Sequence, residues 1–215
     1  MSDPVLLPAA LAAHAPALLV AVPLILATVA AAQPSGRFGW ALAFISAAVA
    51  FFCAIELFAA TRAEYAVVSY AMGGWEPPFG IEFRIDGLNA ALLLLLSATA
   101  LVTLVFGFAS VEDEIDRSKR SLFYSAFMLC FAGLSGVAIT GDAFNLFVFL
   151  EISSIGTYAI IAMGWKNDRR ALTASFNYLV MGTIGATFFV IGIGFLYMAT
   201  GTLNMADMAL RIAQL

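Results

Sequence analysis

A single carboxylate lies deep within a long apolar stretch of this 215-residue chain. Glu151 lies near the middle of the apolar segment 143–163. A charged side chain at the centre of a bilayer costs roughly 2.5–3.5 kcal/mol to insert, so such a residue is a functional candidate by default. Burial raises a carboxyl pKa and a nearby cation lowers it, and a group balanced between these effects can exchange a proton near neutral pH. Glu151 is therefore predicted to handle protons or cations; the alternative is a structural Glu hydrogen-bonded between helices.

Three further polar residues fall where they could extend a path from Glu151. Ser154 and Tyr158 follow it by three and seven positions, which places all three on one helix face. Asn177 lies in the next apolar segment, roughly 10 Å from its start, whereas Glu151 lies about 18 Å from the same side. The difference of about 8 Å is too long for direct contact and suits one or two waters. We predict that these four residues line a proton pathway.

Other polar residues within apolar segments are weaker candidates. Glu56 lies near the end of its segment and is expected to extend its carboxylate to the membrane interface. His14 could titrate, but it lies among small residues in a proline-rich segment, and no role is expected for it. Cys53 and Cys130 have no second Cys or His at ligand spacing and are interpreted as buried hydrophobic residues.

No nucleotide, metal or nucleophile motif is present. The glycines of 182–194 lie within an apolar segment and resemble a close helix-packing surface more than a phosphate-binding loop. Together with Ser175 and Tyr178, Gly182 and Gly185 form a small-residue face that we interpret as helix packing. No cofactor and no metal are expected.

The composition requires a membrane. Hydrophobic residues make up 63% of the chain and charged residues 11%, and the mean hydropathy is +0.98. Soluble domains are roughly 45–50% apolar and about 25% charged. These values exclude a nucleic-acid binder, a disordered chain and a secreted disulfide scaffold. The formal net charge of −4 says little, because arguments from net charge assume a wetted surface.

Six segments are long and apolar enough to cross a bilayer, which predicts an all-α polytopic membrane protein. The first carries Pro8, Pro16 and Pro23 and is expected to be kinked. The predicted spans are Leu6–Ala32, Phe38–Ala60, Leu88–Ala109, Leu122–Ile139, Ala143–Met163 and Ala171–Ala199.

The connections between the spans carry turn and strand signals. The long loop 61–87 contains a Gly- and Pro-rich turn at 73–80, and then alternates apolar and charged residues over 81–86. We predict a β-hairpin-like flap at the membrane surface, with Asp86 capping the following helix. Asp142 is predicted to cap the fifth span in the same way. The mixed-charge loop 110–121 is interpreted as a solvated turn.

The positions of Lys and Arg favour an N-terminus and a flap on the outer side, because cytoplasmic loops carry an excess of basic residues. The chain is predicted to form one membrane domain, with two spans and the flap in 1–87 and four spans in 88–215. The inner set is Arg37, Arg117, Lys119, Arg120, Lys166, Arg169 and Arg170, and the outer set is Arg62, Arg84 and Arg211.

Three stretches resemble the D subunit of the Mrp-type multisubunit monovalent cation/proton antiporters. They are GGWEPPFGI at 73–81 followed by DGL at 86–88, TGDAFNLFVFLE at 140–151, and TGTLNMAD at 200–207. The family also includes the antiporter-like subunits of respiratory complex I and membrane-bound hydrogenases. The resemblance extends over nearly the whole chain, but only to the N-terminal part of the family's subunits.

The resemblance implies that Glu151 tunes a lysine on a broken seventh helix, in a subunit of around fourteen helices built from two inverted repeats. The chain ends before that helix, and Lys119 and Lys166 are both loop residues. Many members also carry a lysine where this sequence has Asn177. We therefore expect either that a second polypeptide supplies the remaining helices of the subunit or that this chain is a truncated product. Residues 88–215 would hold the start of the first repeat.

The expected function is a subunit, or an N-terminal fragment, of a multisubunit monovalent cation/proton antiporter in the bacterial inner membrane. Its implied partners are the bilayer, other membrane subunits, protons, and Na⁺ or K⁺. One alternative is a proton-pumping antiporter-like subunit of a complex I- or hydrogenase-type redox complex, where it would form part of a translocase. The other alternative is a non-conducting structural membrane subunit.

Overall fold

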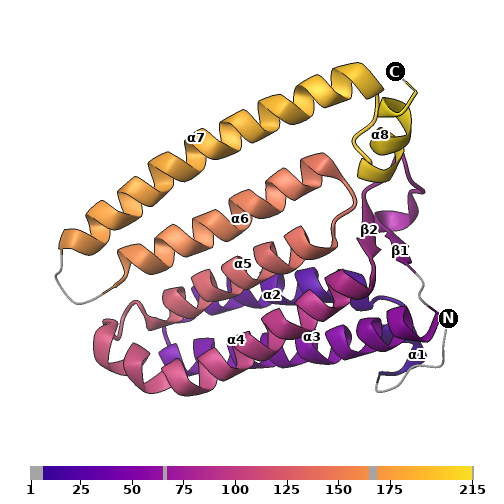
Figure 1. Ribbon diagram of the computed structural model, residues 1–215. Coiled ribbons are helices and arrows are strands. Elements are labelled where there is room, and N and C mark those ends of the chain that lie inside the picture. The colour runs from indigo at the N-terminus through magenta and orange to yellow at the C-terminus, as the bar shows by residue number, and fades with distance from the viewer. Residues whose placement is uncertain (1–6, 65–66, 165–168, 215) are drawn as a thin grey trace.

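The computed structural model describes residues 7–64, 67–164 and 169–214, and these form a bundle of long helices with a small hairpin at one end (Figure 1). Helix α5 lies at the centre of the bundle, where it contacts α2, α3, α4 and α6, and α7 packs on the outer side of α6. The elements are α1 (Ala9–Ala12), α2 (Ala15–Ala31), α3 (Gly36–Glu64), β1 (Val68–Ala71), η1 (Met72–Gly74), β2 (Glu82–Ile85), α4 (Gly87–Glu114), α5 (Arg120–Ile139), α6 (Ala143–Ala162), α7 (Arg169–Thr200) and α8 (Met205–Ile212).

The predicted membrane fold is confirmed, with one correction to its first span. Among the described residues, α3 to α7 are long and apolar enough to cross a membrane, and α2 is a shorter apolar helix of 17 residues. The predicted span from Leu6, which lies outside the described residues, to Ala32 is broken ahead of α2, where His14 is not helical. Pro16 stands in the first turn of α2, where a proline is tolerated because that N–H needs no helical partner.

Close contact between α5 and α6 depends on glycine. Gly133 and Gly136 on α5 and Gly156 on α6 each lie so near the opposite helix that an added Cβ would come within 3 Å of it. Lipid chains are as apolar as the helices, so association within a membrane relies on such close backbone approach. As a result, 61% of the most apolar stretch of α5 is buried within the chain.

The glycines of α7, which were predicted to form a helix-packing surface, have no close neighbour among the described residues. Only 6% of the most apolar stretch of α7 is buried, and Cβ atoms added at Gly182, Gly185, Gly192 and Gly194 would meet no atom of the described residues. Among the described residues, the predicted packing surface therefore has no neighbour at its glycines, and α7 packs mainly on α6.

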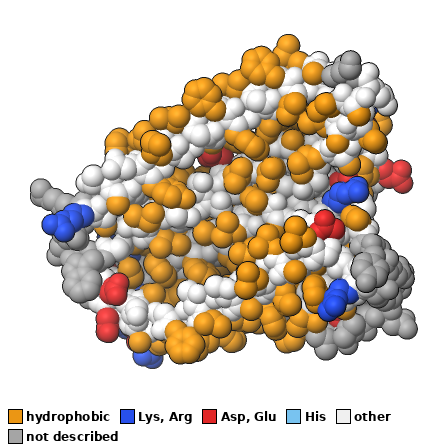
Figure 2. Space-filling view, viewed as in Figure 1, with side chains coloured by type: hydrophobic (Ala, Val, Ile, Leu, Met, Phe, Trp, Pro, Cys, Tyr) orange, Lys and Arg blue, Asp and Glu red, His pale blue; other side chains and the backbone are white. Residues whose placement is uncertain are grey.

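The membrane-facing character of the bundle is visible on its surface. Figure 2 shows hydrophobic side chains over most of one face, with acidic and basic side chains mainly at its two ends. The hairpin and α8 lie at one end, the flap end. The α2–α3 and α4–α5 connections, the last turn of α6 and the first turn of α7 lie at the other, the basic end (Figure 1). The basic end carries the predicted inner set of Lys and Arg, apart from Lys166, which lies outside the described residues. Which end faces the cytoplasm stays a prediction.

The flap is a two-stranded antiparallel hairpin in which β1 pairs with β2, with Val68 opposite Ile85. The predicted strand at 81–86 is therefore confirmed to within one residue at each end. The connection turns at Gly73 and Gly74, whose φ angles of 66° and 78° favour glycine. The predicted cap is present as well, because the Asp86 side chain accepts hydrogen bonds from the first backbone N–H groups of α4.

The α5–α6 contact yields a paired prediction. A Cβ at residue 156 would lie 2.7 Å from the Ala126 carbonyl oxygen and 2.7 Å from the Cys130 backbone nitrogen. Gly156→Ala should therefore lower the free energy of unfolding by about 1–3 kcal/mol through overpacking. The matched control Gly185→Ala meets open space and should raise it, by up to about 1 kcal/mol, because Ala is the better helix former. Unfolding by sodium dodecyl sulfate in mixed micelles measures both, and equal effects of the two changes would contradict the assigned interface.

Candidate functional site

Glu151 lies near the middle of α6, and its side chain is half-buried. At 1.5 Å of rise per residue, its backbone lies about 12 Å from the first residue of α6 and about 17 Å from the last. The carboxylate is thus neither at a helix end nor sealed in the core of the bundle.

Tyr158 sets the register between α6 and α7 on the basic-end side of Glu151. The Ser175 hydroxyl donates a hydrogen bond of 2.8 Å to the Tyr158 carbonyl oxygen. The rings of Tyr158 and Tyr178 lie 6.3 Å apart, centroid to centroid. Because Ser154 and Glu151 share the helix face of Tyr158, this polar face is directed toward α7.

A second contact joins the two helices on the flap-end side of Glu151. Ala143 at the start of α6, Ile193 on α7 and Met208 on α8 form a buried apolar cluster. Glu151 therefore lies between two points of contact with α7, about seven residues from one and eight from the other. The Glu151 side chain therefore has an α6–α7 contact on its basic-end side and another on its flap-end side.

Asn177 does not come together with Glu151. It is exposed on α7 and adjoins Tyr178, which is level with Tyr158. Seven residues of helix separate Tyr158 from Glu151, so Asn177 lies about 10 Å from Glu151 along the axis. This separation is too long for a direct hydrogen bond.

The structure corrects the interpretation of Glu56 and locates His14. Glu56 is only 7% exposed, and its Oε1 accepts a 2.7 Å hydrogen bond from the Leu7 backbone, so the carboxylate does not extend to the interface. His14 is exposed at the break between α1 and α2, where its Nδ1 lies 2.9 Å from the Tyr70 hydroxyl on the hairpin. Both residues connect the N-terminal segment to neighbouring elements.

A buried polar cluster at the flap end was not predicted. Glu82 on β2 is 5% exposed, and its Oε1 accepts a 2.5 Å hydrogen bond from Ser69 on β1. Its Oε2 accepts a 2.7 Å bond from the side-chain amide of Asn204, which is 2% exposed and caps α8. The alternating pattern of 81–86 indicates a strand but not the partners of Glu82, and the residue type of Asn204 signals only a helix cap.

Backbone hydrogen bonds extend this cluster to the start of α6. The Gly141 N–H donates to the Glu82 carbonyl oxygen at 2.8 Å, and the Met205 N–H donates to the Gly141 carbonyl oxygen at 2.8 Å. Asp142 caps α6 as predicted, because its Oδ1 accepts a 2.7 Å bond from the Asn145 N–H. The hairpin and α8 thus determine where α6 begins and, through it, the depth of Glu151.

Glu82 provides a test of this network. Glu82→Ala leaves the Asn204 amide and the Ser69 hydroxyl without their acceptor, and should lower the free energy of unfolding by about 1–3 kcal/mol. Glu82→Gln should have a much smaller effect, because its amide oxygen can accept from Asn204 while its NH₂ group donates to Ser69. Detergent-micelle unfolding of both variants measures the difference, and equal losses would show that the negative charge itself is required.

Asp142 gives a prediction for the pH dependence of stability. Burial raises the pKa of Asp142, against the opposing effect of hydrogen bonds from the Asn145 and Phe144 backbone. Folding then favours the protonated carboxyl, so ionisation of Asp142 reduces stability at neutral pH, and this loss disappears as the pH falls below 3.8, its ordinary pKa. Asp142→Asn keeps a good capping side chain and should melt above the wild type at pH 7, with the two converging at low pH. A variant that melts below the wild type at pH 7 would contradict this.

Comparison with known proteins places this arrangement in a family. Residues 140–214 match the family described as NADH:quinone oxidoreductase/Mrp antiporter, transmembrane. This stretch contains α6 and the polar face of Glu151, α7, and the α8 cap of the flap-end cluster.

Two curated relatives and one solved structure illustrate the similarity. The N subunit of NADH-quinone oxidoreductase from Desulforudis audaxviator is 40% identical over 94% of this chain and 40% of its own length. The D subunit of the Na⁺/H⁺ antiporter from Bacillus subtilis is 37% identical over 69% of this chain and 29% of its own length. A chain of the archaeal membrane-bound sulfane sulfur reductase, a respiratory membrane complex, superposes with a TM-score of 0.81 and 33% identity over 91% of this chain and 39% of that chain.

The chain therefore spans well under half the length of these relatives. Its fold superposes on the solved structure, its residues 140–214 match the family model, and it is a multi-pass membrane protein. Residues 140–214 carry the transmembrane domain shared by NADH:quinone oxidoreductases and Mrp antiporters, and nearly the whole chain is similar to part of an antiporter-like membrane subunit of this kind.

Proposed function

We propose that the chain forms part of a proton-conducting subunit of a multisubunit monovalent cation/proton antiporter in the inner membrane, and that Glu151 carries protons in it. The observation that supports the proposal best is the position of Glu151. Its half-buried carboxylate lies near mid-helix, between two contacts of α6 with α7. Na⁺ or K⁺ would be the exchanged cation, and other membrane subunits would be the partners.

The polar residues around Glu151 suit a hydrated path from the basic end. Tyr158, Ser154 and Ser175 lie on or against the α6 face that carries Glu151, and Asn177 is level with Tyr158 on α7. The separation of about 10 Å between Asn177 and Glu151 fits a chain of waters better than direct transfer. In this path Glu151 is the proton carrier, and Ser154, Tyr158 and Asn177 orient water.

The exposed surface of α7 supports an assembly larger than this chain. Its large apolar side chains are exposed along the whole helix, from Leu172 and Phe176 to Phe195 and Met198. Further membrane helices packed over α7 would bring a cation toward Glu151. In the resembled subunits that cation is a lysine on a broken helix, and the described residues place their own basic side chains near the helix ends.

A redox-driven pump is the second candidate, and one observation favours it. The N subunit of the quinone oxidoreductase matches 94% of this chain, whereas the D subunit of the antiporter matches 69% at a similar identity. Glu151 would have the same proton-carrying role in either assembly. The difference lies in the driving reaction, which is cation exchange in one case and electron transfer to a quinone in the other.

The decisive experiment changes Glu151 in the complete assembly. Inverted membrane vesicles report exchange as the collapse of a pH gradient when Na⁺ or K⁺ is added. Glu151→Gln should reduce exchange to the background of vesicles that lack the assembly, while Glu151→Asp should retain part of it because the carboxylate is kept. Glu114→Gln, at an exposed helix end, is the matched control and should leave exchange unchanged.

The same vesicles distinguish the alternatives. Full exchange in Glu151→Gln, with the assembly intact on native gels, would establish a structural role and refute the proposal. A pH gradient that forms only when an electron donor and a quinone are supplied, and that is lost in Glu151→Gln, would identify the redox-driven pump.

A further inference from the structure

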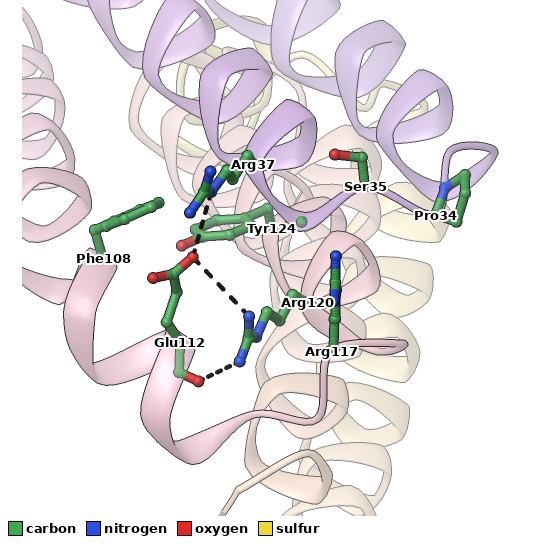
Figure 3. Close-up of a pocket in the computed structure, with 9 residues that line it drawn as sticks. Pro34, Ser35, Arg37, Phe108, Glu112, Arg117, Arg120 and Tyr124 are labelled. Atoms are coloured by element: carbon green, nitrogen blue, oxygen red, sulfur yellow. Dashed lines mark hydrogen bonds and ion pairs between the residues drawn. The ribbon is translucent and has the colours of Figure 1, made fainter.

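A cavity of about 620 Å³ lies at the basic end, between the first turn of α3, the last turns of α4 and the start of α5 (Figure 3). It is separate from Glu151, which is carried by α6 on the far side of α5. The cavity is lined by Pro34, Ser35, Gly36, Arg37, Phe108, Glu112, Arg117, Arg120 and Tyr124.

The charges that line this cavity are unbalanced. Arg37, Arg117 and Arg120 contribute three guanidinium groups, against the single carboxylate of Glu112. Glu112 Oε1 lies 3.6 Å from Arg37 Nε and 4.0 Å from Arg120 Nη1, so one carboxylate is shared by two cations. The cavity wall therefore has an excess positive charge, although exposed acidic residues occur elsewhere on the same connection.

The arginines differ in how firmly they are held. Arg120 donates to the Ile115 carbonyl oxygen at 3.1 Å and to the Glu112 carbonyl oxygen, which fixes its side chain. Arg37 is 82% exposed and Arg117 is exposed, and Figure 3 shows both on the rim of the same space. One cation is thus fixed in place, and two can move to meet a ligand.

A buried hydroxyl on the cavity wall lacks a hydrogen-bond partner. Tyr124 is 3% exposed, and its Oη bonds to no group among the described residues. Figure 3 shows its hydroxyl end directed toward Arg37 and Glu112. Buried hydroxyls are nearly always hydrogen-bonded, so this donor indicates a missing acceptor. The N-terminal end of the 29-residue helix α3, at Gly36, adds a partial positive charge on another side.

Aromatic side chains continue from the cavity toward the middle of the membrane. The ring of Phe108, on the cavity wall, lies 5.2 Å from Trp40, which stacks on Phe44 at 5.5 Å. The Trp40 indole N–H donates to the Leu104 carbonyl oxygen at 2.8 Å. Tryptophan near a helix end is typical of the level at which lipid headgroups meet acyl chains. The cavity is therefore at headgroup depth, with an apolar path below it.

We propose that this cavity binds the phosphate group of an anionic membrane phospholipid, such as phosphatidylglycerol or cardiolipin. The guanidinium groups of Arg37, Arg117 and Arg120 pair with the phosphate oxygens, and Tyr124 donates its hydroxyl proton to one of them. The acyl chains would lie against the partly exposed rings of Phe108, Trp40 and Phe44 on the surface of α3 and α4. A free phosphate could make the same polar contacts but would leave that apolar path unused.

The test compares lipid retention by the full chain purified in mild detergent. Native mass spectrometry, with phosphatidylglycerol or phosphatidylcholine added, gives the relative affinity for each. The double variant Arg37→Gln/Arg117→Gln should bind phosphatidylglycerol roughly 30-fold more weakly, as expected when two cations close to the anion are removed. Arg84→Gln/Lys119→Gln removes the same charge outside the cavity and should bind as the wild type does.

Two single changes separate binding from folding. Tyr124→Phe should leave the melting temperature of the delipidated protein unchanged, because its hydroxyl has no partner there, but should weaken phosphatidylglycerol binding several-fold. Glu112→Gln removes the only carboxylate of the cavity wall and should tighten that binding. A purely structural role of this cluster predicts the opposite results, namely a lower melting temperature and no change in lipid selectivity.

Three outcomes would overturn the proposal. The first is equal retention of phosphatidylglycerol and phosphatidylcholine by the wild type. The second is equal loss of phosphatidylglycerol in the cavity double variant and in its charge-matched control. The third is stabilisation by inorganic phosphate, in neutral-lipid micelles, that matches the effect of phosphatidylglycerol; this would assign the cavity to a free anion.

Discussion

The close approach of α5 and α6 is the contact on which the remaining structure depends. Gly133, Gly136 and Gly156 allow the two helices to meet where side chains would collide. α5 also contacts α2, α3 and α4, so α6 packs on these helices mainly through α5. In a membrane no hydrophobic force compensates for a poor fit between helices, because lipid solvates an exposed helix equally well. The three glycines therefore allow α6, the helix that bears Glu151, to pack closely on α5.

The position of α6 along the membrane normal is set by a different set of contacts, at the flap end. Non-helical backbone between membrane helices must have its polar groups satisfied by protein or water. At the flap end, Gly141 pairs with Glu82 on one side and Met205 on the other, and the Asn204 amide bonds to the Glu82 carboxylate. A shift of α6 along its axis would break all of these hydrogen bonds at once. The depth of Glu151 is thus coupled to a hydrogen-bonded network about 12 Å away.

The sequence predicts those features that depend on neighbouring residues. Hydropathy located the spanning helices, period-two alternation located β2, and residue type located the Asp86 and Asp142 caps. Features that join distant segments could not be predicted. Glu82 and Asn204 are 122 residues apart, and neither position indicates the other. Glu56 was placed wrongly because its partner, the Leu7 backbone, carries no signal in the sequence. The glycines of α7 show another limit of the sequence, because a predicted helix-packing surface does not indicate which helix packs on it, and no described residue lies against these glycines.

The exposure of α7 bears directly on what could approach Glu151 under the proposed function. α7 contacts α6 near Tyr158 and near Ala143, and Glu151 lies between these contacts with its carboxylate half-buried. A further helix that packed over this face would set the charge and polarity next to the carboxylate. Under the proposed function, that covering surface would control the proton, so one bundle geometry could serve assemblies driven by cation exchange or by electron transfer.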